Sequence, residues 1–195
     1  MRPVNTERRA ALADAAIGVL AETGIRGLTH RAVDAAAGEP DGTTSRYFRT
    51  REAMLLGVVD RVKEIRMKML DDLVSDGLDR AELVEAFVVA VHNALHRDRP
   101  KQLAMMALLL ESSHRPALRE ELTLVALSMR QMLVKLCARA GVELTERDAW
   151  ALMNFFNGTL FLAMSLPQLE QPTEEIVRAG VSALLTPYDG SARPT

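Results

Sequence analysis

Hydroxyl and basic side chains gather between Thr43 and Tyr47, and their types suit contact with double-stranded DNA. Thr43, Thr44 and Ser45 are small, so a helix that carries them can approach base edges closely. The next two residues are Arg46, which can reach guanine or phosphate, and Tyr47, whose hydroxyl can donate to a phosphate oxygen. This run predicts a surface that reads a DNA groove.

The residues on either side of this run suit phosphate. Gly42 has no side chain, so the backbone there can approach the sugar–phosphate chain. Thr50 and Arg51 combine a helix N-terminus with a cation, an arrangement that favours anions. We also expect contacts from the start of the preceding helix, at Thr29, His30 and Arg31.

Two short helices must position these side chains. The pattern predicts one helix from Thr29 that stops at Gly38, and a second over residues 41–48. Two short helices joined by a tight turn containing glycine form a helix-turn-helix, whose second helix enters the major groove. On spacing alone, an ordinary helical turn rich in Gly and Thr remains an alternative.

The first 60 or so residues resemble the TetR family of bacterial regulators. The resemblance lies in residues 17–24, in Thr29 with Val33, and in the pairs at 37–38, 42–43, 47–48, 51–52 and 54–55. It implies an all-α protein of nine helices, with an N-terminal three-helix helix-turn-helix domain and a C-terminal helical domain for ligand binding and dimerisation. Glu39, Asp41 and Ser45 depart from the usual family pattern and bear on base contacts.

Composition agrees with a helical protein. The chain has 195 residues, 48% of them apolar and only 4% aromatic, with abundant helix formers. Residues 1–70 have a net charge of +3 and residues 71–195 of −5, so the basic end is the one suited to phosphate. One cysteine and no secretory signal favour a cytoplasmic location.

Helical spacing continues to the C-terminal region, and we find no convincing strand. We expect a DNA-binding domain over residues 1–50, a ligand-binding and dimerisation domain over 51–186, and a mobile tail over 187–195. The expected helices cover residues 6–23, 29–38, 41–48, 50–75, 79–96, 100–114, 116–140, 145–166 and 173–185.

Ten methionines are many for this length, and methionine adapts to varied apolar ligands. We therefore predict a pocket for a small, partly apolar effector, although plain core packing is the better interpretation of any single methionine. The predicted lining is Met105, Met106, Met129, Met132, Trp150, Met153 and Phe156.

Residues 149–169 form an uncharged run, interrupted by Asn154, Asn157 and Thr159. The interruptions argue against a membrane span, and a purely intramolecular core helix is an alternative. Resemblance implies that the last two long helices of each subunit build a homodimer interface. We place Asn157, Gly158, Phe161 and Leu162 in it.

The function predicted is a DNA-binding regulator, usually a repressor in this family, whose affinity for a palindromic operator responds to a small molecule. No cofactor is expected. His92, His96 and His114 are too few for a metal site that the sequence can support, and Cys137 is expected to be buried. The rivals are a ligand-binding protein without DNA activity, favoured by Glu39 and Asp41, and an all-helical enzyme, which lacks any catalytic constellation.

Overall fold

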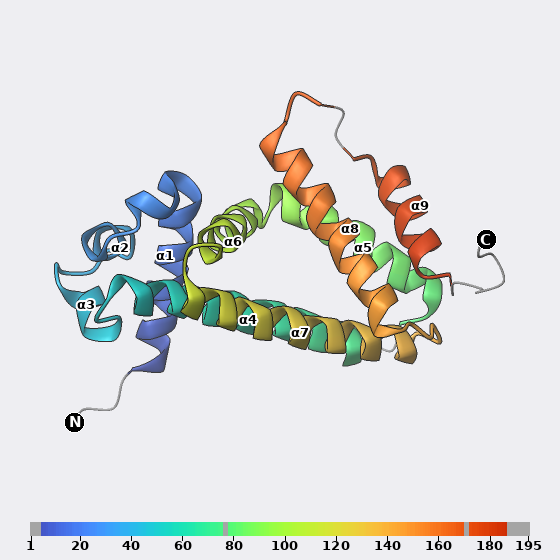
Figure 1. Ribbon diagram of the computed structural model, residues 1–195, viewed down its shortest axis with the longest axis horizontal. Helices are drawn as coiled ribbons and strands as arrows, with labels where there is room; N and C mark the ends of the chain where they lie inside the picture. The colour runs from blue at the N-terminus through green and yellow to red at the C-terminus, as the bar shows by residue number, and fades with distance from the viewer. Residues whose placement is uncertain (1–4, 76–77, 170–171, 187–195) are drawn as a thin grey trace. The chain divides into compact units, whose positions relative to one another are not determined.

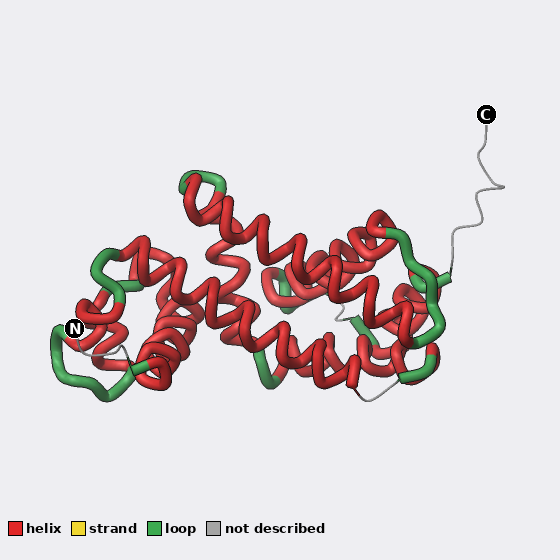
Figure 2. Tube along the Cα trace, turned by 90° about the horizontal axis from the view of Figure 1, so that it is seen from below, coloured by secondary structure: helices red, strands yellow, loops and turns green. Residues whose placement is uncertain are grey.

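The computed structural model describes residues 5–75, 78–169 and 172–186 (Figure 1), and the predicted tail over 187–195 lies outside them. Within these ranges the chain contains helices and connecting loops and no strand (Figure 2). The helices are α1 Thr6–Gly27, α2 His30–Ala36, α3 Thr43–Tyr47, α4 Arg51–Ser75, α5 Arg80–His96, α6 Arg99–Ser112, α7 Pro116–Arg139, α8 Glu146–Ser165 and α9 Glu174–Leu184. The all-helical prediction is confirmed.

The chain divides into two compact units. Unit 1 comprises Met1–Arg66 and Asp98–Ala126, and unit 2 comprises Met67–Arg97 and Leu127–Thr195. In the part of the chain that is described, no helix combines the length and apolar character needed to cross a membrane.

Unit 1 is built around α1, which packs against α2 and along α6. Leu12, Ala16 and Leu20 form the buried stripe of α1, at the spacing of one helical face. Arg61 of α4 binds Asp14 of α1 through two hydrogen bonds of 2.8 and 2.9 Å. The first turns of α4 are therefore tied to α1.

Unit 2 contains α5, α8 and α9, which pack against one another. The ring of Phe155 lies close to Gly180, where an added Cβ would come within 2.3 Å of the ring. Because Gly180 has no side chain, α8 and α9 can approach closely. Arg178 of α9 also binds Glu85 of α5 with bonds of 2.7 and 2.9 Å. The first contact joins consecutive helices, and the second joins α9 to α5, which lies much earlier in the sequence.

The helix starts agree closely with the sequence predictions, because the predicted caps form. Asp79 and Glu82 make the expected capping box, and Thr145 caps α8 together with Asp148. Ends differ more. The sequence predicts that the first helix ends at Gly24; Gly24 has a φ of 67° and only interrupts α1, which continues for one further turn to Gly27. The sixth helix ends at Ser112, two residues earlier than expected.

Candidate nucleic-acid interface

The short helix α3 is held at its start by Asp34, a buried carboxylate of α2 that is only 1% exposed. Asp34 accepts hydrogen bonds from the backbone N–H of Gly42 at 2.8 Å and of Thr44 at 2.6 Å, and from the Thr44 hydroxyl at 2.5 Å. These donors belong to the first turn of α3, whose N–H groups have no partner within the helix. Asp34 therefore caps α3 from the neighbouring helix.

The charge of Asp34 is maintained by its partners. Burial by itself raises the pKa of this carboxyl, but the hydrogen bonds from Thr44 and Gly42 and the nearby His30 outweigh burial and hold the pKa below its ordinary value. Asp34 is therefore an anion at neutral pH, as its role at a helix N-terminus requires.

The other end of α3 is held by His30, also from α2. The carbonyl oxygen of Phe48, the C-cap of α3, accepts a hydrogen bond from His30 Nε2 at 2.6 Å. His30 and Asp34 are four residues apart, so they lie on one face of α2. We call this pair the α2 clamp, because it holds both ends of a helix of five residues.

Phe48 anchors the same region in the core of unit 1, where it is 1% exposed. Its ring lies against Gly57 of α4, where an added Cβ would come within 2.3 Å of the ring. The guanidinium of Arg9 lies over the ring, 5.0 Å from its centre. Contacts from α1 and α4 thus fix the segment directly after α3.

The prediction that Thr43 and Thr44 face base edges needs correction. Thr43 is 7% exposed and its hydroxyl donates to the Pro40 carbonyl at 2.7 Å, while Thr44 is fully buried against Asp34. Both side chains are used inside the protein, so they are unavailable to a base. Gly42 has a φ of 85°, a left-handed conformation that glycine adopts without strain. The backbone conformation therefore explains why glycine occupies this position.

Arg51 also differs from the expectation. Its Nη2 donates to the carbonyl oxygen of Ile25, and its Nε is buried without a hydrogen-bond partner. The guanidinium is thus turned into unit 1, where it joins the start of α4 to the end of α1. Thr50 does cap α4, accepting from the Ala53 N–H at 3.0 Å.

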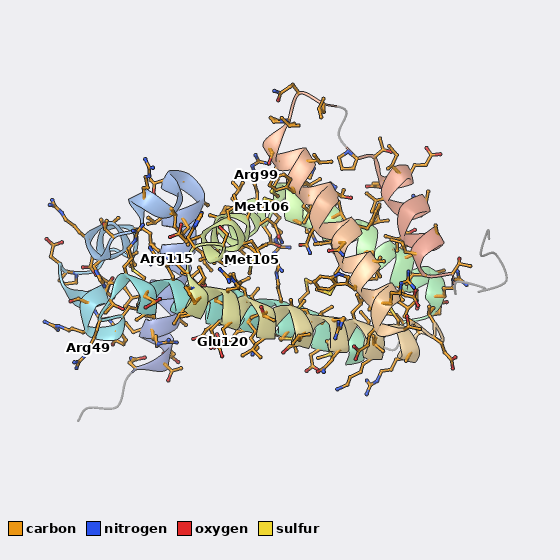
Figure 3. The ribbon with its side chains drawn as sticks, viewed as in Figure 1. Arg49, Arg99, Met105, Met106, Arg115 and Glu120 are labelled. Carbon is orange, nitrogen blue, oxygen red and sulfur yellow. The ribbon has the colours of Figure 1, made fainter. Side chains whose placement is uncertain are left out.

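The remaining candidates lie at the surface. Thr29 is exposed and caps α2, accepting from the Ala32 N–H at 3.1 Å. Sequence reasoning overlooked Arg49, which is exposed just after α3 and points away from the helices (Figure 3). We define the recognition surface as the exposed or half-buried side chains of Arg31, Ser45, Arg46, Tyr47 and Arg49.

Glu39, a departure from the family pattern, is bound to Arg8 of α1. Arg8 Nε donates to Glu39 Oε1 at 3.0 Å, and Arg8 Nη2 donates to Oε2. This hydrogen-bonded pair raises the pKa of Arg8. The Glu39 carboxylate therefore ties the turn to α1, and its charge is balanced by Arg8. No sequence signal marked Arg8 as the partner.

The predicted pocket residues fall in both units. In unit 1, Met105 is buried and Met106 is half-buried on α6 (Figure 3). In unit 2, the half-buried members are Met129, Met132, Met153 and Phe156. Trp150 is 45% exposed, on the face of α8 that carries the predicted interface residues, so its assignment to a pocket is corrected.

The predicted interface residues lie on an exposed face of α8. Phe161 is 46% exposed and Leu162 is 55% exposed, and Asn157 and Gly158 precede them on the same face. Asn157 donates to the carbonyl of Met153 at 2.9 Å, and a Cβ at Gly158 would meet nothing within 4 Å. We define the α8 face as Trp150, Asn157, Gly158, Phe161, Leu162 and Leu166, all of them exposed.

The histidine and cysteine side chains show no catalytic or metal-binding arrangement in the described part of the chain. The rings of His92 and His96 are 4.6 Å apart, and among the described residues no three His, Cys, Asp or Glu side chains are grouped so that they could hold a metal ion. Cys137 is buried, which raises the pKa of its thiol to about 12. The thiol therefore stays protonated at neutral pH.

Comparison with known proteins agrees with this architecture. Residues 78–187 match the family model described as tetracyclin repressor-like, C-terminal domain. No curated protein matches the chain in sequence.

Solved structures resemble nearly the whole chain. The multidrug binding protein EbrR in complex with imidazole is 26% identical with a TM-score of 0.67, over 98% of each chain. The EbrR complex with ethidium is 28% identical with a TM-score of 0.67, over 93% of this chain and 99% of that one. A TetR-family member from Streptomyces coelicolor A3 is 27% identical with a TM-score of 0.68, over 91% and 98%.

Proposed function

Because this chain belongs to the TetR family of transcriptional regulators, we propose that it is a dimeric repressor whose binding to a palindromic operator is controlled by a small molecule. Members of this family are regulators and not enzymes, as the sequence predicted. The observation that carries the proposal is the α2 clamp, which fixes α3 while leaving the recognition surface open.

The recognition surface supports specific roles in DNA binding. Ser45 and Arg46 are exposed on α3, and we assign them to base edges in the major groove. Arg31, Tyr47 and Arg49 are assigned to phosphates, where a cation or a hydroxyl donor positions the helix without reading sequence. The exposed hydroxyl of Thr29 can also donate a hydrogen bond to a DNA phosphate.

A regulator is favoured over a ligand-binding protein without DNA activity. That rival depended on Glu39 and Asp41, which place negative charge near the DNA. The carboxylate of Glu39 is held by Arg8, so one of these two charges is balanced within the protein. Asp41 alone is a weaker obstacle to a surface that carries Arg31, Arg46 and Arg49.

Dimerisation is supported by the α8 face. Phe161, Leu162 and Leu166 are exposed apolar side chains grouped towards the C-terminal end of the α8 face, and such a group marks an interaction site. A second copy of the chain would cover the α8 face and bring two recognition surfaces to one operator, which a twofold dimer reads as two half-sites.

Ligand control is supported by similarity to EbrR, whose solved complexes contain imidazole and ethidium. We propose that residues 1–50 bind DNA and that residues 51–186 bind the effector and dimerise. Each unit by itself offers candidate ligand contacts, which are Met105 and Met106 in unit 1 and, separately, Met129, Met132, Met153 and Phe156 in unit 2. An effector changes DNA affinity only if it binds one conformation better than another.

Two substitutions test the assigned DNA contacts. Arg46→Ala should weaken binding to the operator by about 1–3 kcal/mol and relax the preference for one base pair. Tyr47→Phe should weaken binding to all duplexes alike, because it removes a phosphate contact. The exposed Arg97, at the end of α5, provides a control as Arg97→Ala. Operator affinity that is equal in all three variants would contradict the assignment.

A further inference from the structure

Arg66 of α4 is a half-buried cation whose hydrogen-bond partner is a neutral side chain. Its Nη2 donates to Oε1 of Gln102 on α6 at 2.8 Å, and both residues belong to unit 1. Loss of water around the guanidinium lowers the pKa of Arg66. The positive charge is therefore placed where it is costly to keep.

Three other half-buried arginines are bound to carboxylates, whereas Arg51 donates to the backbone carbonyl of Ile25. Arg61 binds Asp14 at 2.8 Å, Arg115 binds Glu111 at 2.5 Å, and Arg130 binds Glu146 at 2.7 Å. An amide oxygen accepts one hydrogen bond but cannot balance a charge. A guanidinium has five N–H donors in a planar fork that matches a carboxylate, so Arg66 has the capacity to bind an anion.

Apolar residues occupy neighbouring positions on both helices. Val62, one turn before Arg66 on α4, is 2% exposed. On α6, Met105 and Met106 come about one turn after Gln102, and both are largely removed from solvent (Figure 3). A compound with an apolar body and one anionic group would match these residue types.

We propose that Arg66 and Gln102 bind the anionic group of an organic effector, a carboxylate or a sulfonate, while the apolar body of the effector contacts α6. The amide group of Gln102 supplies a second donor beside the guanidinium. This inference rests on the ligand control proposed above and adds to it the charge of the ligand. A site at Arg66 and Gln102 would therefore prefer an organic anion to an organic cation such as ethidium.

Three probes that share one ring system test the charge preference: 2-naphthoate, 2-naphthalenemethanol and 2-naphthylmethylammonium. Calorimetric titration of the full chain should show naphthoate binding at least about tenfold tighter than the alcohol, with the ammonium compound weakest. In Arg66→Gln the affinities for naphthoate and the alcohol should become equal within about twofold. Arg97→Gln, which changes an exposed arginine, should keep the wild-type order.

Thermal unfolding without any probe separates a ligand-binding role from a structural one. Among the described residues the hydrogen-bond partner of Arg66 is neutral, and a cation without a balancing anion does not stabilise the free protein, so Arg66→Gln should leave the melting temperature unchanged or raise it. A decrease of more than about 2–4 °C would show that Arg66 is a structural residue and would overturn the proposal. Three other results would also overturn the proposal: tightest binding of the ammonium compound, no saturable binding of naphthoate, or an unchanged preference for naphthoate over the alcohol in Arg66→Gln.

DNA binding is measured separately in the same preparations. If the protein binds duplex DNA but prefers no anion, only the inference about Arg66 fails. If it binds naphthoate through Arg66 but not DNA, the regulator function fails and the ligand site remains. Naphthoate should alter the operator affinity of the wild type and not that of Arg66→Gln.

Discussion

At the scale of single residues, Asp34 positions the proposed DNA-binding site from inside the protein. It is buried, accepts three hydrogen bonds from the start of α3, and lies near His30. An unsatisfied buried donor costs about 1–3 kcal/mol, so losing this carboxylate would leave several such costs at one place. The orientation of α3 therefore depends on a residue of α2.

Replacing Asp34 with Ala should destabilise the protein by about 3 kcal/mol and weaken operator binding, because Gly42 and Thr44 lose their acceptor. Chemical unfolding and DNA titration measure the two effects. The exposed Asp41 offers a matched control, since Asp41→Ala removes a carboxylate from the same turn without a buried partner. Equal stability losses in the two variants would contradict the capping role.

The same carboxylate predicts a dependence on acid. Because the folded pKa of Asp34 is lowered, its contribution to stability is complete above the unfolded pKa of about 4 and is lost as the pH falls below it. The unfolding free energy of the wild type should therefore decrease more steeply than that of Asp34→Asn between about pH 5 and pH 3. Parallel pH profiles for the two proteins would count against this role.

Sequence alone predicted an exposed position for Arg46 but not the internal partners of Arg51 and of the buried threonines. Arg46 is exposed and Tyr47 is half-buried, and their contacts with DNA stay a prediction. Thr43 and Thr44 were assigned to DNA because small hydroxyl residues suit a groove, yet both are buried. Their true partners, Pro40 and Asp34, are set by the tertiary turn, and no periodic pattern records such contacts. The pairing of Glu39 with Arg8 across 31 positions was hidden for the same reason.

At the scale of helices, α3 cannot be stable by itself. It has five residues, and an isolated helix of that length does not persist in water. The α2 clamp holds its two ends, and Phe48 packs into unit 1 directly after it. The recognition helix is thus positioned by α2 and by the start of α4.

The close approach of Phe48 to α4 depends on Gly57. Gly57→Ala would place a Cβ within 2.3 Å of the Phe48 ring, so this variant should lose about 1–3 kcal/mol of stability and bind DNA more weakly. Gly18→Ala in α1 is the matched control, because its Cβ would meet nothing within 4 Å. It should be neutral or stabilise the helix by about 0.5–1 kcal/mol. Thermal unfolding of both variants measures the difference. A lower melting temperature for Gly18→Ala than for Gly57→Ala would refute the packing argument.

Helix starts could be predicted from sequence because caps are local. The side chains of Thr29, Thr50, Asp79, Thr145 and Thr173 all accept hydrogen bonds from the first turn of the helix that each of them caps. Helix ends depend more on tertiary packing and on the path of the next loop. The extra turn after Gly24 and the early end of α6 at Ser112 show this limit.

At the scale of the whole molecule, the exposed α8 face requires a partner. Phe161 and Leu162 are about half exposed in the single chain, and a second subunit would remove them from water. One recognition surface reads few base pairs, whereas two related by a twofold axis read a palindrome. Dimerisation and operator binding should therefore fail together.

Phe161→Glu should convert the dimer to a monomer, because it places a charge beside Leu162 on the α8 face, where the partner subunit would bury it. Sedimentation velocity measures the change. Val89→Glu, at a side chain of α5 that is 54% exposed, is the control and should remain dimeric. If Phe161→Glu sediments as the wild type does, the interface lies elsewhere.

Specific binding of one operator by a dimer of this chain can be measured by fluorescence anisotropy over a salt series. The titrant is duplex DNA from upstream of the chain's own gene, compared with a random duplex of equal length. We expect saturation at one dimer per palindromic site, with affinity that falls steeply with salt because phosphate contacts release counterions. Binding no tighter than to the random duplex, or an affinity independent of salt, would contradict it.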